Sequence, residues 1–362
     1  MKRVDYKLVI AIVFISLIGC IMIYSSSSIW AEYKFGDAYK YLKAQVMFLI
    51  IGYVLLYIVT KVDYRKYFNK ANIIFGVCFL LLILVLIPGI GTVRNGSRSW
   101  FGIGGFGMQP SEFMKLGLTI FVSKYLVNNS RDIKDIKKGI FPILLVIFLV
   151  FALIMLQPDF GTGVVITFSL IVLLFVSGCR LGFFVKLGAL GIVGIIVLIL
   201  IAPYRMERIV SFLNPWSDPL GSGFQIIQSL YAIGPGGLLG LGLGNSIQKH
   251  FYLPEPQTDF IFAIICEELG FVGAGVVILL FGFIIYRGLS IAINCKELFG
   301  KYLAFGITFM FAFQAILNLS VVVGLIPVTG VTLPFLSYGG SSLLITMVSM
   351  GILLNISKNN FK

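Results

Sequence analysis

Residues 250–270 read HFYLPEPQTDFIFAIICEELG, and this stretch decides the fold. Its second half begins an apolar run that continues to about residue 286 and is long enough to cross a lipid bilayer. Glu267 and Glu268 lie inside that run, where a carboxylate is costly unless it faces a polar cavity or a charged partner. They are therefore either functional residues or side chains that hold helix ends. Asp259 lies at the boundary of the run, after two prolines, and is the centre of the candidate site.

Composition places the whole chain in the same class as this stretch. Of its 362 residues, 59% are hydrophobic and only 12% are charged, and the mean hydropathy is +1.01, far above that of an ordinary soluble domain. The net charge of +13 is carried by basic residues in short loops between apolar runs, rather than on one folded face, so no nucleic-acid partner is predicted. These features predict a polytopic membrane protein that contacts lipid.

Apolar runs of bilayer-spanning length predict an all-α protein with ten transmembrane helices. The predicted spans are residues 8–28, 44–60, 71–88, 110–127, 140–157, 159–177, 181–202, 260–286, 302–326 and 335–356. The first run follows Lys2, Arg3 and Lys7, as a secretory signal does. Its length and the absence of an Ala-x-Ala site favour an uncleaved first helix.

The distribution of positive charge predicts the orientation. With the N-terminus inside, 19 of the 28 lysines and arginines fall on the inner side, which the positive-inside rule assigns to the cytoplasm. Both termini are then cytoplasmic, and residues 203–259 form a large extracellular loop between the seventh and eighth helices. The cysteines lie in spans (Cys20, Cys78, Cys266) or in inner loops (Cys179, Cys295), so no disulfide framework is predicted.

The outer loops contain the candidate chemistry. Four predicted helices have a proline at their outer start, namely Pro110, Pro158, Pro256 and Pro334. Helix N-termini expose unpaired N–H groups that bind phosphate, but the sequence does not determine whether these four ends converge. Within the long loop, residues 225–234 have the spacing of an amphipathic interfacial helix. The glycine-dense residues 234–244 are suited to cover a membrane surface or line a groove.

Five ordered motifs carry a family resemblance. They are NGSRSW (95–100), QPSEFMK (109–115), QPDFGTG (157–163), YLPEPQTDFIFA (252–263) and LPFLSYGGSS (333–342). Together they resemble the SEDS family, which comprises the FtsW, RodA and SpoVE proteins, and are closest to its FtsW and SpoVE branch. The resemblance covers the chain in order and implies a single integral membrane domain, residues 1–362, with its large outer loop at about 203–259.

The resemblance implies an enzyme, a peptidoglycan glycosyltransferase of the bacterial cytoplasmic membrane. Such an enzyme polymerises lipid II on the outer face for cell division or sporulation and works with a class B penicillin-binding protein, a transpeptidase. The family's essential aspartate maps onto Asp259. Its polar cavity and substrate-binding positions map onto Arg98, Glu112, Lys115, Asp159, Thr258 and Ser337.

The residue types suit this chemistry. Joining two lipid-linked sugars needs a base for the acceptor hydroxyl, which Asp259 can supply, and positive charge for the departing pyrophosphate. The candidates to hold it are Arg98, Lys115, Arg205, Arg208 and Lys249, with a divalent cation such as Mg²⁺ or Mn²⁺ as a further possibility. Glu112 and Lys115 are three residues apart, so a local ion pair and a ligand contact both remain open.

A glycosidase-type carboxylate pair is disfavoured, because Glu267 would lie about 12 Å along a straight helix from Asp259, beyond the ~5–9.5 Å that such pairs use. Two other functions remain as alternatives. A lipid II flippase should gather its charges and broken helices near the bilayer midplane. A non-catalytic scaffold that recruits the transpeptidase would not depend on Asp259.

Overall fold

The computed structural model describes residues 4–94, 96–103, 106–133, 135–201, 203–221 and 223–358. Its elements in chain order are α1 (Tyr6–Phe35), α2 (Lys40–Lys61), α3 (Arg65–Leu84), β1 (Thr92–Arg94), β2 (Ser97–Ile103), β3 (Phe106–Met108), α4 (Pro110–Asn128), η1 (Ile136–Ile140), α5 (Phe141–Met155), α6 (Phe160–Val176), α7 (Leu181–Ile201), α8 (Pro203–Leu213), η2 (Pro215–Ser217), α9 (Phe224–Ile233), η3 (Gly234–Gly236), α10 (Ile261–Asn294), α11 (Leu298–Val322) and α12 (Gly340–Ser357).

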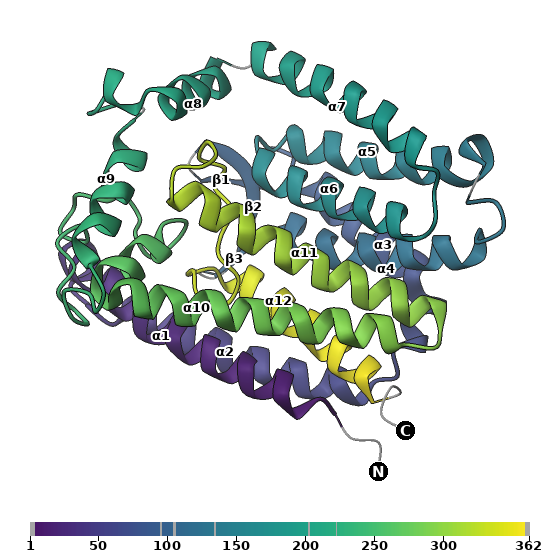
Figure 1. Ribbon diagram of the computed structural model, residues 1–362, viewed down its shortest axis with the longest axis horizontal. Helices are drawn as coiled ribbons and strands as arrows, with labels where there is room; N and C mark the ends of the chain where they lie inside the picture. The colour runs from purple at the N-terminus through teal and green to yellow at the C-terminus, as the bar shows by residue number, and fades with distance from the viewer. Residues whose placement is uncertain are drawn as a thin grey trace.

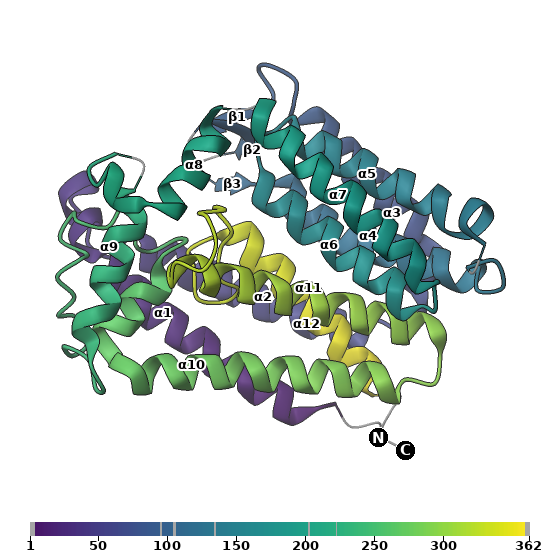
Figure 2. The same cartoon turned by 45° about the horizontal axis from the view of Figure 1, so that its top comes forward.

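The long helices form a bundle of two groups (Figure 2). One group contains α1, α2, α10, α11 and α12, with α2 packed along α12 and α1 along α10. The other contains α3 to α7, and its helices α4 and α6 contact α11 of the first group. Helices suit these apolar sequences because each satisfies its own backbone hydrogen bonds. Side chains on the inward faces, such as Ile15, Leu118 and Leu303, are completely buried.

The structure supports the polytopic architecture in its coarse form. A helix overlaps each of the ten predicted spans. Within the described residues, seven helical segments are long and apolar enough to cross a membrane: Tyr6–Phe35, Lys40–Lys61, Arg65–Leu84, Ile136–Met155, Ile261–Asn294, Leu298–Val322 and Gly340–Ser357. Shorter apolar helices occur at Phe160–Val176 and Leu181–Gly191. Helix α4 carries Glu112, Lys115 and Lys124, so it is less apolar than its neighbours.

The two ends of the bundle differ in kind. At one end, the first and last described residues lie close together (Figure 1), and Asp5 donates its backbone N–H to Ser357. Arg287 of α10 forms an ion pair with Asp5 at this end. The opposite end, which we call the site end, carries residues 85–94, 96–103, 106–109, 156–159, 203–221, 223–260 and 323–339. All of the motifs that resemble the SEDS family begin at the site end.

Strands β1, β2 and β3 form a three-stranded antiparallel sheet that the all-α prediction missed. Thr92 pairs with Trp100, and Phe101 pairs with Met108. Two of the three strands are only three residues long, and the third mixes polar, aromatic and glycine residues, so they lack the apolar alternation that identifies a strand in a sequence. The sheet is attached to the segment before α6, because the Ser97 hydroxyl donates to the carbonyl of Gln157.

The prediction that four helices begin at a proline was wrong in three cases. Only Pro110 occupies the first turn of its helix. Helix α6 begins after Pro158 with Asp159 as its N-cap, and α10 begins at Ile261, beyond Pro256. Helix α12 begins at Gly340, five residues later than the predicted span, because residues 334–339 form a loop instead.

The long segment before α10 is partly helical. Helix α9 confirms the amphipathic helix predicted at residues 225–234, and α8 is an additional helix that was not predicted. The glycine-rich residues 237–242 pair through their backbones with α10, which is kinked at Gly270 (φ 63°). Leu241 donates to the carbonyl of Glu267, and Phe271 donates to that of Gly237. At Gly240 (φ 81°), a Cβ would lie 2.2 Å from the carbonyl oxygen of Glu268, so this approach requires glycine.

Candidate functional site

Asp259 lies just before α10 and is half-buried. Its backbone carbonyl accepts a hydrogen bond of 2.8 Å from the side-chain amide of Asn318 on α11. The carbonyl of the preceding Thr258 accepts one of 2.7 Å from the hydroxyl of Ser337. Asp259 is therefore positioned by groups from two separate segments of the chain.

The side chains of Ser337 and Thr258 form hydrogen bonds to backbone groups of the loops before α10 and α12. The Ser337 hydroxyl also accepts from the backbone N–H of Leu333, and the Thr258 hydroxyl donates to the carbonyl of Glu255. Next to them, the backbone N–H of Tyr338 donates to the carbonyl of Gln257 over 2.8 Å. These bonds join the loop before α12 to the loop before α10, so both residues shape the surroundings of Asp259.

A chain of buried polar groups connects Lys115 to the loop before α12. The Lys115 ammonium lies 2.7 Å from the carboxylate of Glu112 and donates to the Gln314 side chain over 2.9 Å. Gln314 in turn donates to the carbonyl of Thr332 over 2.9 Å. The local ion pair of Glu112 and Lys115 is thus present, and it is one part of a longer network.

Gln314 and Asn318 are site residues that the sequence reasoning missed. They lie four positions apart on one face of α11 and are both buried. Asn318 donates to the carbonyl of Val331 as well as to that of Asp259. The sequence does contain a signal for them. Two side-chain amides four residues apart lie inside an otherwise apolar span, where a polar group costs free energy unless it has a partner or a function.

The N-termini of α4, α6 and α12 meet beside the loop before α12. The Asp159 carboxylate caps α6 by accepting from the N–H of Thr162, and it also accepts from the side chain of Gln109 over 2.9 Å. Gln109, the N-cap of α4, donates its backbone N–H to the hydroxyl of Ser341 in the first turn of α12. The starts of α4, α6 and α12 therefore converge, which the sequence left open.

Two glycines bring Asp259 close to this convergence. A Cβ at Gly161, in the first turn of α6, would lie 2.5 Å from the carbonyl oxygen of Thr329. A Cβ at the next residue of that loop, Gly330, would lie 3.8 Å from a carboxylate oxygen of Asp259. The loop at residues 329–330 thus fits between the start of α6 and Asp259.

A small cavity of ≈ 40 Å³ lies between α4, α11 and α12. Glu112, Lys115, Gln314 and Pro334 are among the residues that line it. A cavity of about 10–15 Å³ on this measure holds one water molecule, so this cavity has room for a few waters but not for a sugar ring.

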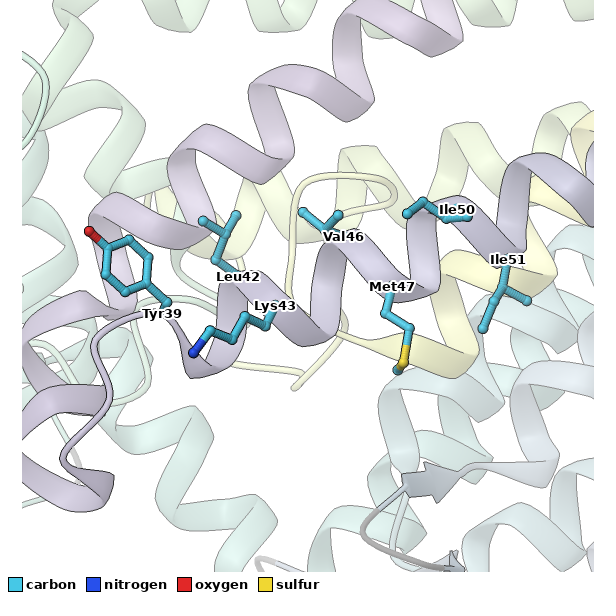
Figure 3. A pocket seen from close by; sticks show the side chains of 7 residues that line it. All are labelled: Tyr39, Leu42, Lys43, Val46, Met47, Ile50 and Ile51. Carbon is cyan, nitrogen blue, oxygen red and sulfur yellow. The ribbon is translucent and has the colours of Figure 1, made fainter.

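A larger groove runs along α2 (Figure 3). It has a volume of ≈ 490 Å³ and is lined by Tyr39, Leu42, Lys43, Val46, Met47, Ile50 and Ile51. The lining is apolar except at the end near Lys43, whose ammonium lies 2.9 Å from Asp37. That hydrogen bond is the main reason why the pKa of Asp37 lies below its usual value. The groove suits an extended hydrocarbon chain.

Two predicted cationic candidates, Arg98 and Lys249, are not part of the hydrogen-bonded network that the structure describes around Lys115. Arg98 is on β2, opposite Val93, and no described residue forms an ion pair with it. Lys249 is buried and paired with Glu268 at 3.0 Å, so it is engaged in the fold. The side chains of Arg205 and Arg208 lie outside the described part of the structure.

The bundle and its polar end define a polytopic helical membrane protein with a buried charged network towards one end of the bundle. The chain belongs to the FtsW/RodA/SpoVE family: the family model described as "Cell cycle protein" matches residues 6–362. This confirms the resemblance carried by the five motifs.

Similar proteins cover nearly the whole chain. "Stage V sporulation protein E" of Bacillus subtilis (strain 168) is 53% identical over 354 residues, covering 98% of this chain and 97% of the relative. "Probable peptidoglycan glycosyltransferase FtsW" of Trichlorobacter lovleyi is 42% identical, covering 98% and 94%. A chain in the solved structure "Structural coordination of polymerization and crosslinking by a peptidoglycan synthase complex" is 33% identical, with a TM-score of 0.82 and 99% of both chains covered.

Proposed function

We propose that this chain is a peptidoglycan glycosyltransferase that polymerises lipid II into glycan strands at the outer face of the bacterial cytoplasmic membrane. The observation that carries the proposal is the placement of Asp259, whose backbone is held by Asn318 beside converging helix N-termini. The relatives named peptidoglycan glycosyltransferase support the reaction class. The relative named for stage V sporulation supports a role in sporulation, and the family description "Cell cycle protein" supports a role in division.

Asp259 is the general base of the proposed reaction. Its carboxylate takes the proton from the acceptor sugar hydroxyl as that oxygen bonds to the anomeric carbon of the donor. The bond between that carbon and the polyprenyl pyrophosphate breaks, and the pyrophosphate leaves with the bonding electrons. Glu267 takes no part, because its carboxylate is engaged by Ser246 and Ile247.

Positive groups stabilise the departing pyrophosphate. The ammonium of Lys115 has three donors, and the described bonds to Glu112 and Gln314 use two of them. The third is assigned to a phosphate oxygen at the mouth of the cavity. The start of α6, capped by Asp159, and Arg98 on the neighbouring sheet complete the proposed polar surroundings.

The groove along α2 is assigned to the polyprenyl chain of lipid II. Its lining is apolar and its volume is ≈ 490 Å³, so it can pack against a hydrocarbon chain by van der Waals contact. Lys43 lies at the end nearer to Tyr39 (Figure 3). In this arrangement the hydrocarbon tail remains at bilayer depth while the sugar head reaches the site end.

The proposed arrangement in the membrane has ten spans within one integral membrane domain, residues 1–362. Helices α1 to α7 and α10 to α12 cross the bilayer, with both termini in the cytoplasm and residues 203–259 outside. The excess of Lys and Arg at the end opposite Asp259 supports this orientation.

A divalent cation, Mg²⁺ or Mn²⁺, is proposed to assist pyrophosphate departure. Among the described residues no group of three or more His, Cys, Asp or Glu side chains is placed to hold a metal ion. Hard oxygen donors are nonetheless available near Asp259: Asn318 Oδ1 and Thr329 Oγ1 are buried and have no hydrogen-bond partner in the described part of the chain. Mg²⁺ commonly binds through one or two carboxylates together with substrate phosphates, so Asp259 would hold it with the pyrophosphate.

A class B penicillin-binding protein, a transpeptidase, is the proposed partner. The support is the likeness to a chain of a peptidoglycan synthase complex that coordinates polymerization and crosslinking. Such a partner would receive the new strand on the same side of the membrane on which it is made.

The test is polymerisation of purified lipid II by the purified protein, with and without its transpeptidase, followed by gel analysis of glycan length. Glycan strands that disappear with Asp259→Asn support the proposal. Movement of labelled lipid II across vesicles without polymer would instead identify a flippase. Polymer that depends on the partner alone, and is unaffected by Asp259→Asn, would identify a scaffold.

A further inference from the structure

A second cluster of buried charges lies two turns along α10 from Asp259, outside the site described above. The ammonium of Lys249 is 3.0 Å from the carboxylate of Glu268, and their side chains are 4% and 0% exposed. Glu267, the neighbour of Glu268, is also fully buried. Charges at such depth persist only with complete partners, so the contacts of the cluster show what it holds.

Glu267 holds a turn of the long outer segment. Its carboxylate accepts from the hydroxyl of Ser246 and from the backbone N–H groups of Ile247 and Gln248, at 2.8 Å and 3.3 Å. The two backbone N–H groups have no other acceptor among the described residues, so the Glu267 carboxylate satisfies them. Glu267 therefore joins residues 246–248 to α10.

Glu268 connects the same turn to α1. Its two carboxylate oxygens accept from the hydroxyl of Ser25, at 2.7 Å and 2.6 Å, and one of them accepts from the N–H of Ser246. Lys249 in turn donates to Glu268, to the carbonyl of Gly244 and to Ser25. All three ammonium donors are used, and no position in this cluster is left for a substrate.

The ion pair closes a ring of chain that contains Asp259. Lys249 and Glu268 are 19 positions apart, and Asp259 lies about midway between them. The ring is attached at two places. Asn318 and Ser337 hold its Asp259 side, and Ser25 holds its Glu268 side to α1.

We propose that Ser25, Lys249 and Glu268 are positioning residues for glycosyl transfer, which fix the segment that carries Asp259 against α1. The inference rests on the proposed function of Asp259 as the base. Since a displacement of about 1 Å at a reacting group can cost on the order of 10²-fold in rate, loosening the ring at Glu268 lowers turnover although no cluster residue contacts the substrate.

Ser25→Ala is the sharpest test, because it removes the contact with α1 and leaves the ion pair of Lys249 and Glu268 in place. We expect kcat for lipid II polymerisation per folded molecule to fall on the order of tenfold, with KM nearly unchanged and a lower melting temperature, because the buried Glu268 and Lys249 side chains each lose a hydrogen-bond partner. Ser25→Thr keeps the hydroxyl, so its kcat should remain near the wild-type value. Ser27→Ala is the matched control, because the buried Ser27 hydroxyl bonds only to the Ile23 carbonyl of its own helix, and its kcat stays at the wild-type value.

A second variant combines Lys249→Met with Glu268→Gln, so that no buried charge is left without its partner. It is expected to fold and to lose turnover as Ser25→Ala does. Wild-type kcat in both variants, or an equal loss in Ser25→Ala and Ser27→Ala, would overturn the inference. Asp259→Asn in the same assay separates the two proposals: if it is active, the base assignment fails; if it is inactive while Ser25→Ala turns over normally, only the positioning role fails.

Discussion

The side-chain amide of Asn318 donates to the backbone carbonyl of Asp259 over 2.8 Å and to that of Val331 over 2.7 Å. One residue of α11 thus holds the segment before α10 and the loop before α12 together. Four positions earlier, Gln314 holds Thr332 and accepts from Lys115. Helix α11 therefore sets the position of the proposed base relative to the proposed pyrophosphate-binding ammonium.

Replacing Asn318 with leucine should reduce both stability and turnover. The change leaves two buried carbonyls without donors, at about 1–3 kcal/mol each in unfolding free energy, and it frees Asp259 to move. We expect polymerisation per folded molecule to fall at least about tenfold, measured with lipid II after correction for the folded fraction.

Asn355 provides the matched control for Asn318. It is a buried asparagine at the opposite end of the bundle, where it bonds to the backbone of Thr60 and Tyr64. Asn355→Leu should destabilise the protein comparably without lowering turnover per folded molecule. An equal loss of turnover in both variants would show that Asn318 acts only through stability.

Asp259→Asn should abolish synthesis while the protein remains folded. The amide keeps the shape of the side chain but cannot accept the proton, and general-base catalysis typically contributes about 10²–10⁴-fold in rate. Glu255→Gln is the control, because Glu255 is an exposed acid in the same loop. Normal polymer from Asp259→Asn together with loss in Glu255→Gln would transfer the role of base to Glu255.

The helices were predictable because each is a local apolar run whose length the bilayer dictates. The start of α12 was not, because residues 334–339 are held out of the helix by partners distant in sequence. The Ser337 hydroxyl bonds to Thr258, and the Tyr338 N–H bonds to Gln257. Local helix signals cannot reveal such contacts.

The site was predicted through its motifs and only partly through its chemistry. Asp259, Glu112 and Lys115 were named from their charge at the boundary of a span, and the structure connects them through Gln314 and Asn318. Lys249 was also proposed as a pyrophosphate group on charge alone. Its partner Glu268 lies 19 positions away, and only the fold shows that this charge is already neutralised.

Removing both charges of the buried Glu112 and Lys115 pair should show whether the pair binds pyrophosphate or only stabilises the fold. Exchanging the two residues is a poor test, because a carboxylate at position 115 would face the Gln314 oxygen that now accepts from Lys115. Glu112→Gln combined with Lys115→Met removes both charges, which for a purely structural pair is close to neutral. If Lys115 binds pyrophosphate, polymerisation falls by about 10²-fold or more while the melting temperature changes little.

The control for that double variant is Asp5→Asn with Arg287→Met, which removes the ion pair at the opposite end of the bundle. It should leave turnover per folded molecule unchanged. Wild-type polymerisation in the Glu112 and Lys115 double variant would assign that pair to the fold alone.

Reporter fusions should place Asp259 outside the cell. A reporter after Lys138 or Lys301 is expected in the cytoplasm, and one near Asp218 is expected outside, because 19 of the 28 basic residues lie on the predicted inner side. Alkaline phosphatase and fluorescent protein fusions give opposite signals in the two compartments. Finding the segment at Asp218 in the cytoplasm would exclude polymerisation at the outer face.

Arg98→Lys should lower activity although it conserves charge. Side chains alternate along a strand, so Arg98 faces away from its neighbours Ser97 and Ser99, of which Ser97 contacts Gln157 and Ser99 is 2% exposed. Arg98 can therefore meet a substrate that approaches beside the sheet, where a planar guanidinium binds two phosphate oxygens and an ammonium binds one. We expect kcat/KM for lipid II to fall about tenfold or more, with no change in melting temperature. Arg131→Lys, in an exposed loop at the opposite end, should have no effect. Full activity of Arg98→Lys would show that Arg98 supplies at most general positive charge and does not hold the pyrophosphate through a bidentate contact.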